Sequence, residues 1–364
     1  MSDEPAAPHR RRPRYAGKYP RRFEDKYKEH QPEQYPETVG KVLASGKTPA
    51  GSHVPILVAE VLEALHPRPG DIVVDCTLGY GGHARAIVER IQPGGRLIGL
   101  DVDPLELPRT EARMRGLGLD ASVFAVRRSN FAGLHAALAA EGIAGADCLL
   151  ADLGVSSMQL DTPARGFSYK TPGPLDMRMN PNRGQPVSAW LRKLQPAALA
   201  DLLRENADEP HAAEIADALA GQSIERTSDL TDLIRATLSP RGEDEREQSV
   251  RRVFQALRIA VNEEFTALDT LLRHLPACLN PGGRAAIISF HSGEDQRVKK
   301  AFQAGLRDGQ YAAIADEPVR PSAEERRANP RAGAAKLRWA RRSSIAIVRV
   351  VASIAISALL RVRF

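Results

Sequence analysis

Short apolar runs alternate with helical stretches between residues 71 and 152. The runs predicted as strands are 71–75, 96–101, 122–126 and 147–152, and helical stretches at about 82–91, 104–115 and 131–141 separate them. Helices of this length between strands imply βαβ crossovers, which place the strands in one parallel sheet covered on both faces. In open α/β sheets of this kind, a ligand crevice lies at the carboxyl ends of the strands.

The strand rhythm stops after Asp152. Residues 160–180 are rich in Gly, Pro and Met, and residues 186–260 carry leucines and valines at helical spacing. Strand character returns at 283–290. We therefore predict a helical insert, placed at 161–261, for substrate recognition. The α/β domain is then made of the two segments 51–160 and 262–342.

The two ends of the chain are basic, whereas the middle is acidic. Residues 1–50 carry a net charge of +4 and residues 321–364 a net charge of +8, which leaves −6 for 51–320. Residues 1–50 show no apolar period, so we expect a disordered tail there. Basic ends commonly bind polyanions such as RNA, but they also serve solubility alone.

The segment 343–364 has an unknown role. Its run Ile345–Leu360 is apolar apart from Arg349 and two serines, with basic residues on both sides. A membrane-spanning helix needs about 20 mostly apolar residues, so this run is short for one. A last sheet element is favoured over a helix that touches a membrane surface.

The cysteine and histidine content argues against disulfides and metals. Cys76, Cys148 and Cys278 are too scattered for a disulfide framework or a zinc site, which fits a reducing compartment. The histidines show no metal-ligand spacing. No apolar stretch near Met1 resembles a secretory signal. We expect a cytoplasmic protein without a metal site.

The first strand ends in a glycine-rich turn, Asp75-Cys76-Thr77-Leu78-Gly79-Tyr80-Gly81-Gly82-His83. The spacing Gly79-x-Gly81-x-x-Ala84 matches the dinucleotide fingerprint, which is weak evidence alone. The carboxylate of Asp75 at the strand end would repel a pyrophosphate but suits a cationic ligand. S-adenosylmethionine, with a sulfonium and an amino group, is such a ligand.

Acidic and polar residues also follow the other strands. Asp101 ends the second strand, where a carboxylate can bind ribose hydroxyls, and Asp103 is expected mostly to cap the next helix. Asp152 and Gln159 follow the fourth strand and belong beside the glycine turn. After the strand at 283–290, His291 could form a wall of the same crevice, although Ser292-Gly293-Glu294-Asp295 is equally typical of a helix start.

In these motifs the chain resembles the ribosomal small-subunit RNA (cytosine-N4)-methyltransferase family, known as MraW or RsmH. The matching motifs are His53-Val54-Pro55, Thr77-Leu78-Gly79-x-Gly81-Gly82-His83, Asp101-x-Asp103-Pro104, Asp152-Leu153-Gly154-Val155-Ser156-Ser157-x-Gln159-Leu160-Asp161, Arg165-Gly166-Phe167-Ser168, Gly173-Pro174-Leu175-Asp176-Met177-Arg178-Met179, Ala256-Leu257-Arg258-Ile259-x-Val261-Asn262-x-Glu264, Ser289-Phe290-His291-Ser292 and Asn329-Pro330-Arg331. They run in order from about residue 52 to 338. Met158 and Gly293 depart from the pattern, where the family usually has Pro and commonly Leu.

The resemblance implies a Rossmann-like class I methyltransferase sheet with an inserted helical domain. It also implies S-adenosylmethionine-dependent N4-methylation of a cytosine in the decoding region of 16S rRNA, as naked RNA or in the assembled small subunit. Carried over by motif, the expected cofactor contacts are Gly81, Gly82, His83, Asp101, Phe131, Asp152 and Gln159.

The catalytic hypothesis assigns Asp152 as acceptor for the cytosine N4–H, with His291 as a second candidate. The N4 lone pair is delocalised into the ring, and a hydrogen-bond acceptor would localise it and help remove a proton. Arg178, Arg183, Arg192 and the basic ends are candidates for phosphate contacts.

Other function classes stay open on the sequence. One is a methyltransferase for another RNA, a protein or a small molecule. Another is a non-catalytic RNA-binding assembly factor that holds S-adenosylmethionine as a structural ligand. A nicotinamide oxidoreductase ranks last.

Overall fold

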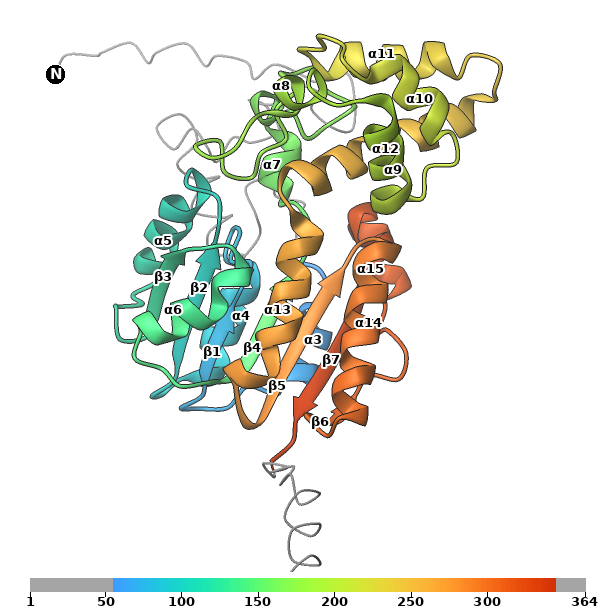
Figure 1. Ribbon diagram of the computed structural model, residues 1–364. Coiled ribbons are helices and arrows are strands. Elements are labelled where there is room, and N and C mark those ends of the chain that lie inside the picture. The colour runs from blue at the N-terminus through green and yellow to red at the C-terminus, as the bar shows by residue number, and fades with distance from the viewer. Residues whose placement is uncertain (1–54, 345–364) are drawn as a thin grey trace, which may run out of the picture. The chain divides into compact units, whose positions relative to one another are not determined.

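The computed structural model describes residues 55–344 (Figure 1). The expectations for the tail 1–50 and for the run Ile345–Leu360 lie outside the described residues. Within residues 55–344, no helix is both long enough and apolar enough to cross a membrane. The same residues contain no group of three or more His, Cys, Asp or Glu side chains arranged to hold a metal ion.

A seven-stranded sheet organises the fold, in the order β3-β2-β1-β4-β5-β7-β6. Its strands are β1 (Ile72–Asp75), β2 (Arg96–Asp101), β3 (Phe124–Arg128), β4 (Ala146–Asp152), β5 (Leu279–Ser289), β6 (Tyr311–Ile314) and β7 (Lys336–Arg342). The first five strands are parallel, and β7 runs antiparallel to both of its neighbours. The four strands predicted before residue 153 are confirmed.

The chain reverses its order across the sheet at β1, which pairs with β2 on one side and β4 on the other. Ligands of open parallel sheets bind where the strand order reverses, outside the carboxyl ends. β5 begins earlier than the predicted residue 283, and β6 and β7 were not predicted.

Helices cover both faces of the sheet because its strands are apolar on both sides. Adjacent β1 residues point to opposite faces: Val73 belongs to one hydrophobic cluster and Val74 to the other. The helices of the Val73 face are α3 (Val58–Leu65), α4 (Gly82–Ile91) and α5 (Glu106–Gly116). The helices of the Val74 face are α6 (Leu134–Ala140), α13 (Glu264–Cys278) and α14 (Ser292–Arg307), and Figure 1 shows α13 and α14 alongside β5.

The helical character predicted for residues 186–260 is confirmed. The helices are α8 (Val187–Leu191), α9 (Pro196–Ala207), α10 (Ala212–Leu219), α11 (Thr227–Thr237) and α12 (Glu243–Val261). They bury leucines, valines and Phe254 in a third cluster, separate from the two sheet clusters. The shorter elements are α7 (Ser157–Asp161), the 3-10 turns η2 (Phe131–Gly133), η3 (Pro163–Arg165) and η4 (Pro330–Ala334), and α15 (Ala323–Ala328).

A buried ion pair ties the segment after α7 to the tip of β2. Asp103 lies just before α5, where its Oδ1 accepts from the backbone N–H groups of Leu105 at 2.9 Å and Glu106 at 3.4 Å, although Leu105 and not Asp103 is the N-cap residue. Asp103 does more than the sequence indicated, because its other oxygen lies 2.7 Å from Nη1 of Arg165 and both side chains are buried. Arg165 also donates to the carbonyls of Arg178 and Met179. A single guanidinium therefore fixes the loop before α8 against the sheet.

We predict that Arg165→Met lowers the free energy of unfolding by about 3–5 kcal/mol, because it leaves the Asp103 carboxylate buried without its cation. Urea denaturation followed by circular dichroism measures the change. The matched control is Arg204→Met, which removes an exposed ion pair with Asp201 on α9 and should cost less than about 1 kcal/mol. Equal losses in the two variants would contradict this role of Arg165.

Candidate active site

Three carboxylates lie at the carboxyl ends of adjacent strands: Asp75 on β1, Asp101 on β2 and Asp152 on β4. We call them the strand-tip acids. Thr77 links two of them, since its backbone N–H donates to Oδ1 of Asp75 at 3.1 Å and its Oγ1 accepts from the backbone N–H of Asp152 at 2.6 Å. The N–H of Gly79 donates to Oδ2 of Asp101 at 2.8 Å. The predicted convergence of these residues is therefore present.

The glycine turn lets the backbone run close beneath the strand-tip acids. Gly79 and Gly81 have φ values of 51° and 87°, a region that residues with a Cβ rarely adopt. Gly82 has no room for a Cβ, which would collide with the ring of Pro55. Gly81 is the N-cap of α4, and no side chain caps that helix in the described structure. The first N–H groups of α4 thus lack side-chain partners.

Desolvation makes the strand-tip acids hard to ionise, although only Asp75 is fully buried and Asp101 and Asp152 are partly exposed. Desolvation, assisted by the charge of Asp101, raises the pKa of Asp75 to about 7. Desolvation likewise raises the pKa of Asp101 to about 6. For Asp152, desolvation and the charges of Asp75 and Glu294 raise the pKa to about 8. Asp75 is thus repelled by Asp101 and Asp152 by Asp75, and a cationic ligand would relieve this repulsion.

Asp152 also has an oxygen without a hydrogen-bond partner. Its Oδ1 is buried and accepts no hydrogen bond from residues 55–344, whereas Asp75 accepts from Thr77. Buried acceptors are nearly always satisfied, so an orphan at a strand tip marks a place where a ligand donates. This orphaned oxygen is the strongest functional indication in the described chain.

His83 sits beside Asp152 as a neutral side chain. Its Nε2 lies 2.9 Å from the carbonyl of Ile56, which can only accept, so Nε2 carries the hydrogen. Its Nδ1 lies 3.9 Å from Oδ2 of Asp152. Burial lowers the pKa of His83 to about 4, so at neutral pH it adds no positive charge near the acids.

His291 follows β5 as the N-cap residue of α14. Its Nε2 lies 3.2 Å from Oε1 of Glu294, yet neither buried ring nitrogen makes an aligned hydrogen bond within the described structure. Its ring packs on Phe265, with centroids 5.6 Å apart. Burial opposes ionisation of Glu294, but His291, Arg258 and the N–H of Phe290 outweigh it and lower the Glu294 pKa. Glu294 is therefore an anion near Asp152.

The structure places Gln159 and Phe131 differently from the strand-tip acids. Gln159 is buried, its Oε1 accepting from the N–H of Ser156 at 2.9 Å and its Nε2 donating to Asp103 at 3.0 Å. Both ends of the Gln159 amide therefore form hydrogen bonds within the protein. Phe131 is half-buried in η2, directly after β3, where Asn130 caps the turn. Ligand contact by either residue stays a prediction.

An ion pair between Arg258 and Glu264 was not predicted. The guanidinium makes two hydrogen bonds, of 2.8 and 2.9 Å, to the carboxylate. Both residues stood in a motif of the resembled family, but the contact depends on the break between α12 and α13. Asp295, by contrast, is held by Arg338 at 2.7 Å and belongs to the scaffold.

The parallel sheet with one antiparallel strand at β7, the glycine turn after β1 and the acids at the β2 and β4 tips define a Rossmann-like class I methyltransferase fold. The MraW methylase family model matches residues 50–343, and the chain belongs to this family.

Named relatives cover nearly the whole chain. The chain is 47% identical over 339 residues to the ribosomal RNA small subunit methyltransferase H 2 of Alkaliphilus metalliredigens, covering 91% of this chain and 97% of the relative. It is 45% identical over 341 residues to the ribosomal RNA small subunit methyltransferase H 1 of Lachnoclostridium phytofermentans, covering 91% and 93%. A SAM-dependent O-methyltransferase structure from Thermotoga maritima is a distant likeness, with TM-score 0.36, 10% identity and coverage of 79% and 64%.

We predict that Asp152→Asn stabilises the ligand-free protein at pH 8. The native carboxyl has a pKa raised from 3.8 to about 8. The folded state therefore holds its proton more tightly than the unfolded state, and stability falls as pH rises through this window. Asparagine has no carboxyl group to ionise, so the Asp152→Asn variant does not lose this stability as the pH rises. We expect a melting temperature about 2–4 °C higher at pH 8 and a flatter pH dependence, by differential scanning fluorimetry.

Asp120→Asn is the control of opposite sign. Hydrogen bonds from Ser122 and Val123 lower the pKa of this exposed carboxyl, so its charged form is favoured by folding. Its replacement should give no stabilisation at pH 8. A melting temperature of Asp152→Asn that is unchanged or lower at that pH would count against a desolvated carboxyl at the β4 tip.

Proposed function

We propose that this protein transfers a methyl group from S-adenosylmethionine to the N4 amine of a cytosine in the decoding region of 16S rRNA. Two observations support the proposal. Relatives at 45–47% identity are named ribosomal RNA small subunit methyltransferases. The orphaned Oδ1 of Asp152, at the switch point of the sheet, is the observation that carries it. The buried free thiols of Cys76, Cys148 and Cys278 favour a reducing, cytoplasmic setting.

The described residues fit the proposed cofactor. The strand-tip acids form no ion pair with Lys or Arg in the described chain, and His83 is neutral, so the site lacks a positive charge. S-adenosylmethionine when bound would supply that charge and an electrophilic methyl group. The residues proposed to hold it are Gly81, Gly82, His83, Asp101, Phe131, Asp152 and Gln159.

Asp152 is the proposed proton acceptor. An exocyclic amine attacks better when one N–H is hydrogen-bonded to an anion, because its lone pair is then less delocalised. Oδ1 of Asp152 is buried and free to accept such a bond. A nearby cationic ligand lowers the Asp152 pKa and so favours its charged form. His291, whose Nδ1 has no hydrogen-bond partner in the described structure, is the second candidate for this proton.

Transfer of labelled methyl groups to small-subunit RNA tests the activity, and mapping the modified base tests the cytosine N4 assignment. With saturating cofactor, we expect Asp152→Asn to lower kcat by about 10²–10⁴-fold, the usual worth of a positioned base. Asp244→Asn, an exposed change on α12, should retain wild-type kcat.

Each other outcome has a definite meaning. Label on a protein or another RNA identifies a methyltransferase with a different acceptor. Cofactor binding without any transfer identifies an assembly factor. Full turnover by Asp152→Asn at saturating cofactor would remove Asp152 from the chemical step.

Cofactor binding should release protons near pH 7. Asp75 and Asp152, with pKa values of about 7 and 8, are partly protonated there without ligand. A bound cation lowers both pKa values, so protons leave and affinity rises with pH between about 6 and 8. Calorimetric titrations in buffers of different ionisation enthalpy measure the release. Asp152→Asn should release fewer protons, and a buffer-independent heat would contradict the coupling.

A further inference from the structure

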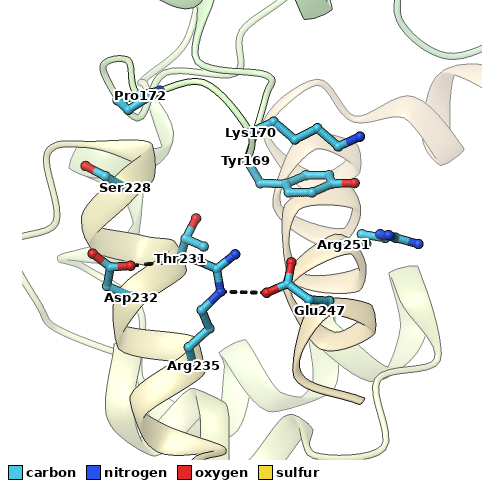
Figure 2. A pocket seen from close by; sticks show the side chains of 9 residues that line it. All are labelled: Tyr169, Lys170, Pro172, Ser228, Thr231, Asp232, Arg235, Glu247 and Arg251. Carbon is cyan, nitrogen blue, oxygen red and sulfur yellow. Dashed lines mark hydrogen bonds and ion pairs between the residues drawn. The ribbon is translucent and has the colours of Figure 1, made fainter. Parts of the chain in front are cut away.

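A cavity lies among the helices of the region 161–261, and none of the strand-tip acids lines it. Its volume is about 390 Å³, within the range of small-ligand pockets. Figure 2 shows it between the segment 169–172, α11 and α12. We call it the insert pocket, and its lining residues are Tyr169, Lys170, Pro172, Ser228, Thr231, Asp232, Arg235, Glu247 and Arg251.

One wall of the insert pocket is aromatic. The Tyr169 ring is partly exposed and meets Phe254 of α12 in an edge-to-face contact, with centroids 5.8 Å apart. Since Phe254 is buried in the helical core, this contact fixes the Tyr169 ring in place. A fixed, partly exposed ring is the feature on which proteins stack unpaired nucleic-acid bases.

The charges of the insert pocket divide into a paired set and an unpaired set. Arg235 reaches from α11 to Glu247 on α12, with Nε 2.6 Å from Oε1, and its Nη1 lies 3.8 Å from Asp232. Lys170 and Arg251 are exposed, and neither forms an ion pair with a carboxylate in residues 55–344. Figure 2 shows both extending to the same side as the Tyr169 ring. The Nζ of Lys170 lies over the Tyr169 ring, 5.8 Å from its centroid, so a stacked base would take the other face of the ring or displace this flexible side chain.

Two of the three arginines predicted to bind phosphate already contact carboxylates of the protein. Arg178 makes hydrogen bonds of 2.7 Å to both carboxylate oxygens of Asp176. Arg192 lies 3.5 Å from Glu225. Only Arg183 of that predicted group is exposed without an ion pair in the described structure. The unpaired cations that adjoin both a cavity and an aromatic ring are Lys170 and Arg251.

Helix α12 connects the insert pocket to the active site. Arg251 lines the pocket, and Arg258, near the end of the same helix, pairs with Glu264 and faces the charge of Glu294. The two arginines are seven positions apart, which is about 10 Å along the helix axis. An RNA strand that runs along α12 from the active site would pass the insert pocket.

We propose that the insert pocket binds one unpaired nucleotide of the substrate RNA, close in sequence to the methylated cytosine. The base stacks on Tyr169, and its phosphates contact Lys170 and Arg251. This inference rests on the proposed function, because it assumes that the substrate is RNA.

The test uses full-length protein and a 16S rRNA decoding-region fragment, with binding measured directly and methyl transfer measured separately. We expect the double variant Lys170→Gln/Arg251→Gln to bind this RNA about tenfold more weakly. The slope of log affinity against log salt should fall by about 1.4, as for two lost phosphate contacts to a single strand. Cofactor affinity and kcat at saturating RNA should stay at wild-type values.

The matched control is Lys193→Gln/Arg204→Gln, which removes two exposed cations elsewhere in the region 161–261 and should leave affinity and slope unchanged. For the base, Tyr169→Phe should bind like wild type, whereas Tyr169→Leu should lose on the order of tenfold. Melting temperatures check that each variant is folded. A loss in Tyr169→Phe equal to that in Tyr169→Leu would argue against stacking.

The outcomes separate the two proposals. Unchanged RNA affinity and salt slope in Lys170→Gln/Arg251→Gln overturn the insert pocket as an RNA site, even if wild-type protein methylates the RNA. Weakened binding in that variant with no effect of Tyr169→Leu overturns the stacked base. Absence of methyl transfer by wild-type protein, with weakened RNA binding in the double variant, overturns the proposed activity but supports the pocket.

Discussion

Burial of carboxylates without cations is the constraint on which the candidate active site depends. Desolvation is the first cause of the raised pKa in Asp75, Asp101 and Asp152 alike. A chain selected only for stability would place apolar or paired groups at these strand ends, because buried unpaired charge is costly. The cost is offset elsewhere by three hydrophobic clusters. The parallel sheet holds the acids in place, since strand register fixes where each strand ends.

Three other buried acids differ from the strand-tip acids, whereas Glu209 of the helical region resembles Asp152 in having a buried oxygen without a partner in the described chain. Asp103 pairs with Arg165, Glu264 with Arg258, and Asp295 with Arg338. Each of these pairs joins segments far apart in the chain or across a helix break, and each satisfies its charge inside the protein. Asp101 and Asp103 differ in this respect although only one residue separates them. For these three acids, an internal cation rather than residue type accounts for their role in the scaffold.

Sequence reasoning succeeded where local pattern decides structure and failed where pairing across the chain decides it. The strands β1 to β4 were predicted because apolar runs are bounded by turn residues. β7 was missed because Lys336–Arg342 carries four basic residues and is strand only through its pairing with β5 and β6. Asp75, Asp101 and Asp152 were predicted to lie at strand ends, because a predicted strand also fixes which residue ends it. The insert pocket was not found, since its three segments meet only in the folded chain.

The position of the helical region in the chain has a physical reason. It is inserted between β4 and β5, adjacent strands whose tips carry Asp152 and lead to His291. Because β4 and β5 are parallel, α13 is the crossover that returns the chain to the amino end of β5. The helices inserted before α13 follow the carboxyl end of β4, so their last member, α12, ends where this crossover begins. Asn262 fixes this end by accepting from the N–H of Met179 and donating to the carbonyl of Met177. An insertion after β6, at the border of the sheet, would not bring these helices to the same place.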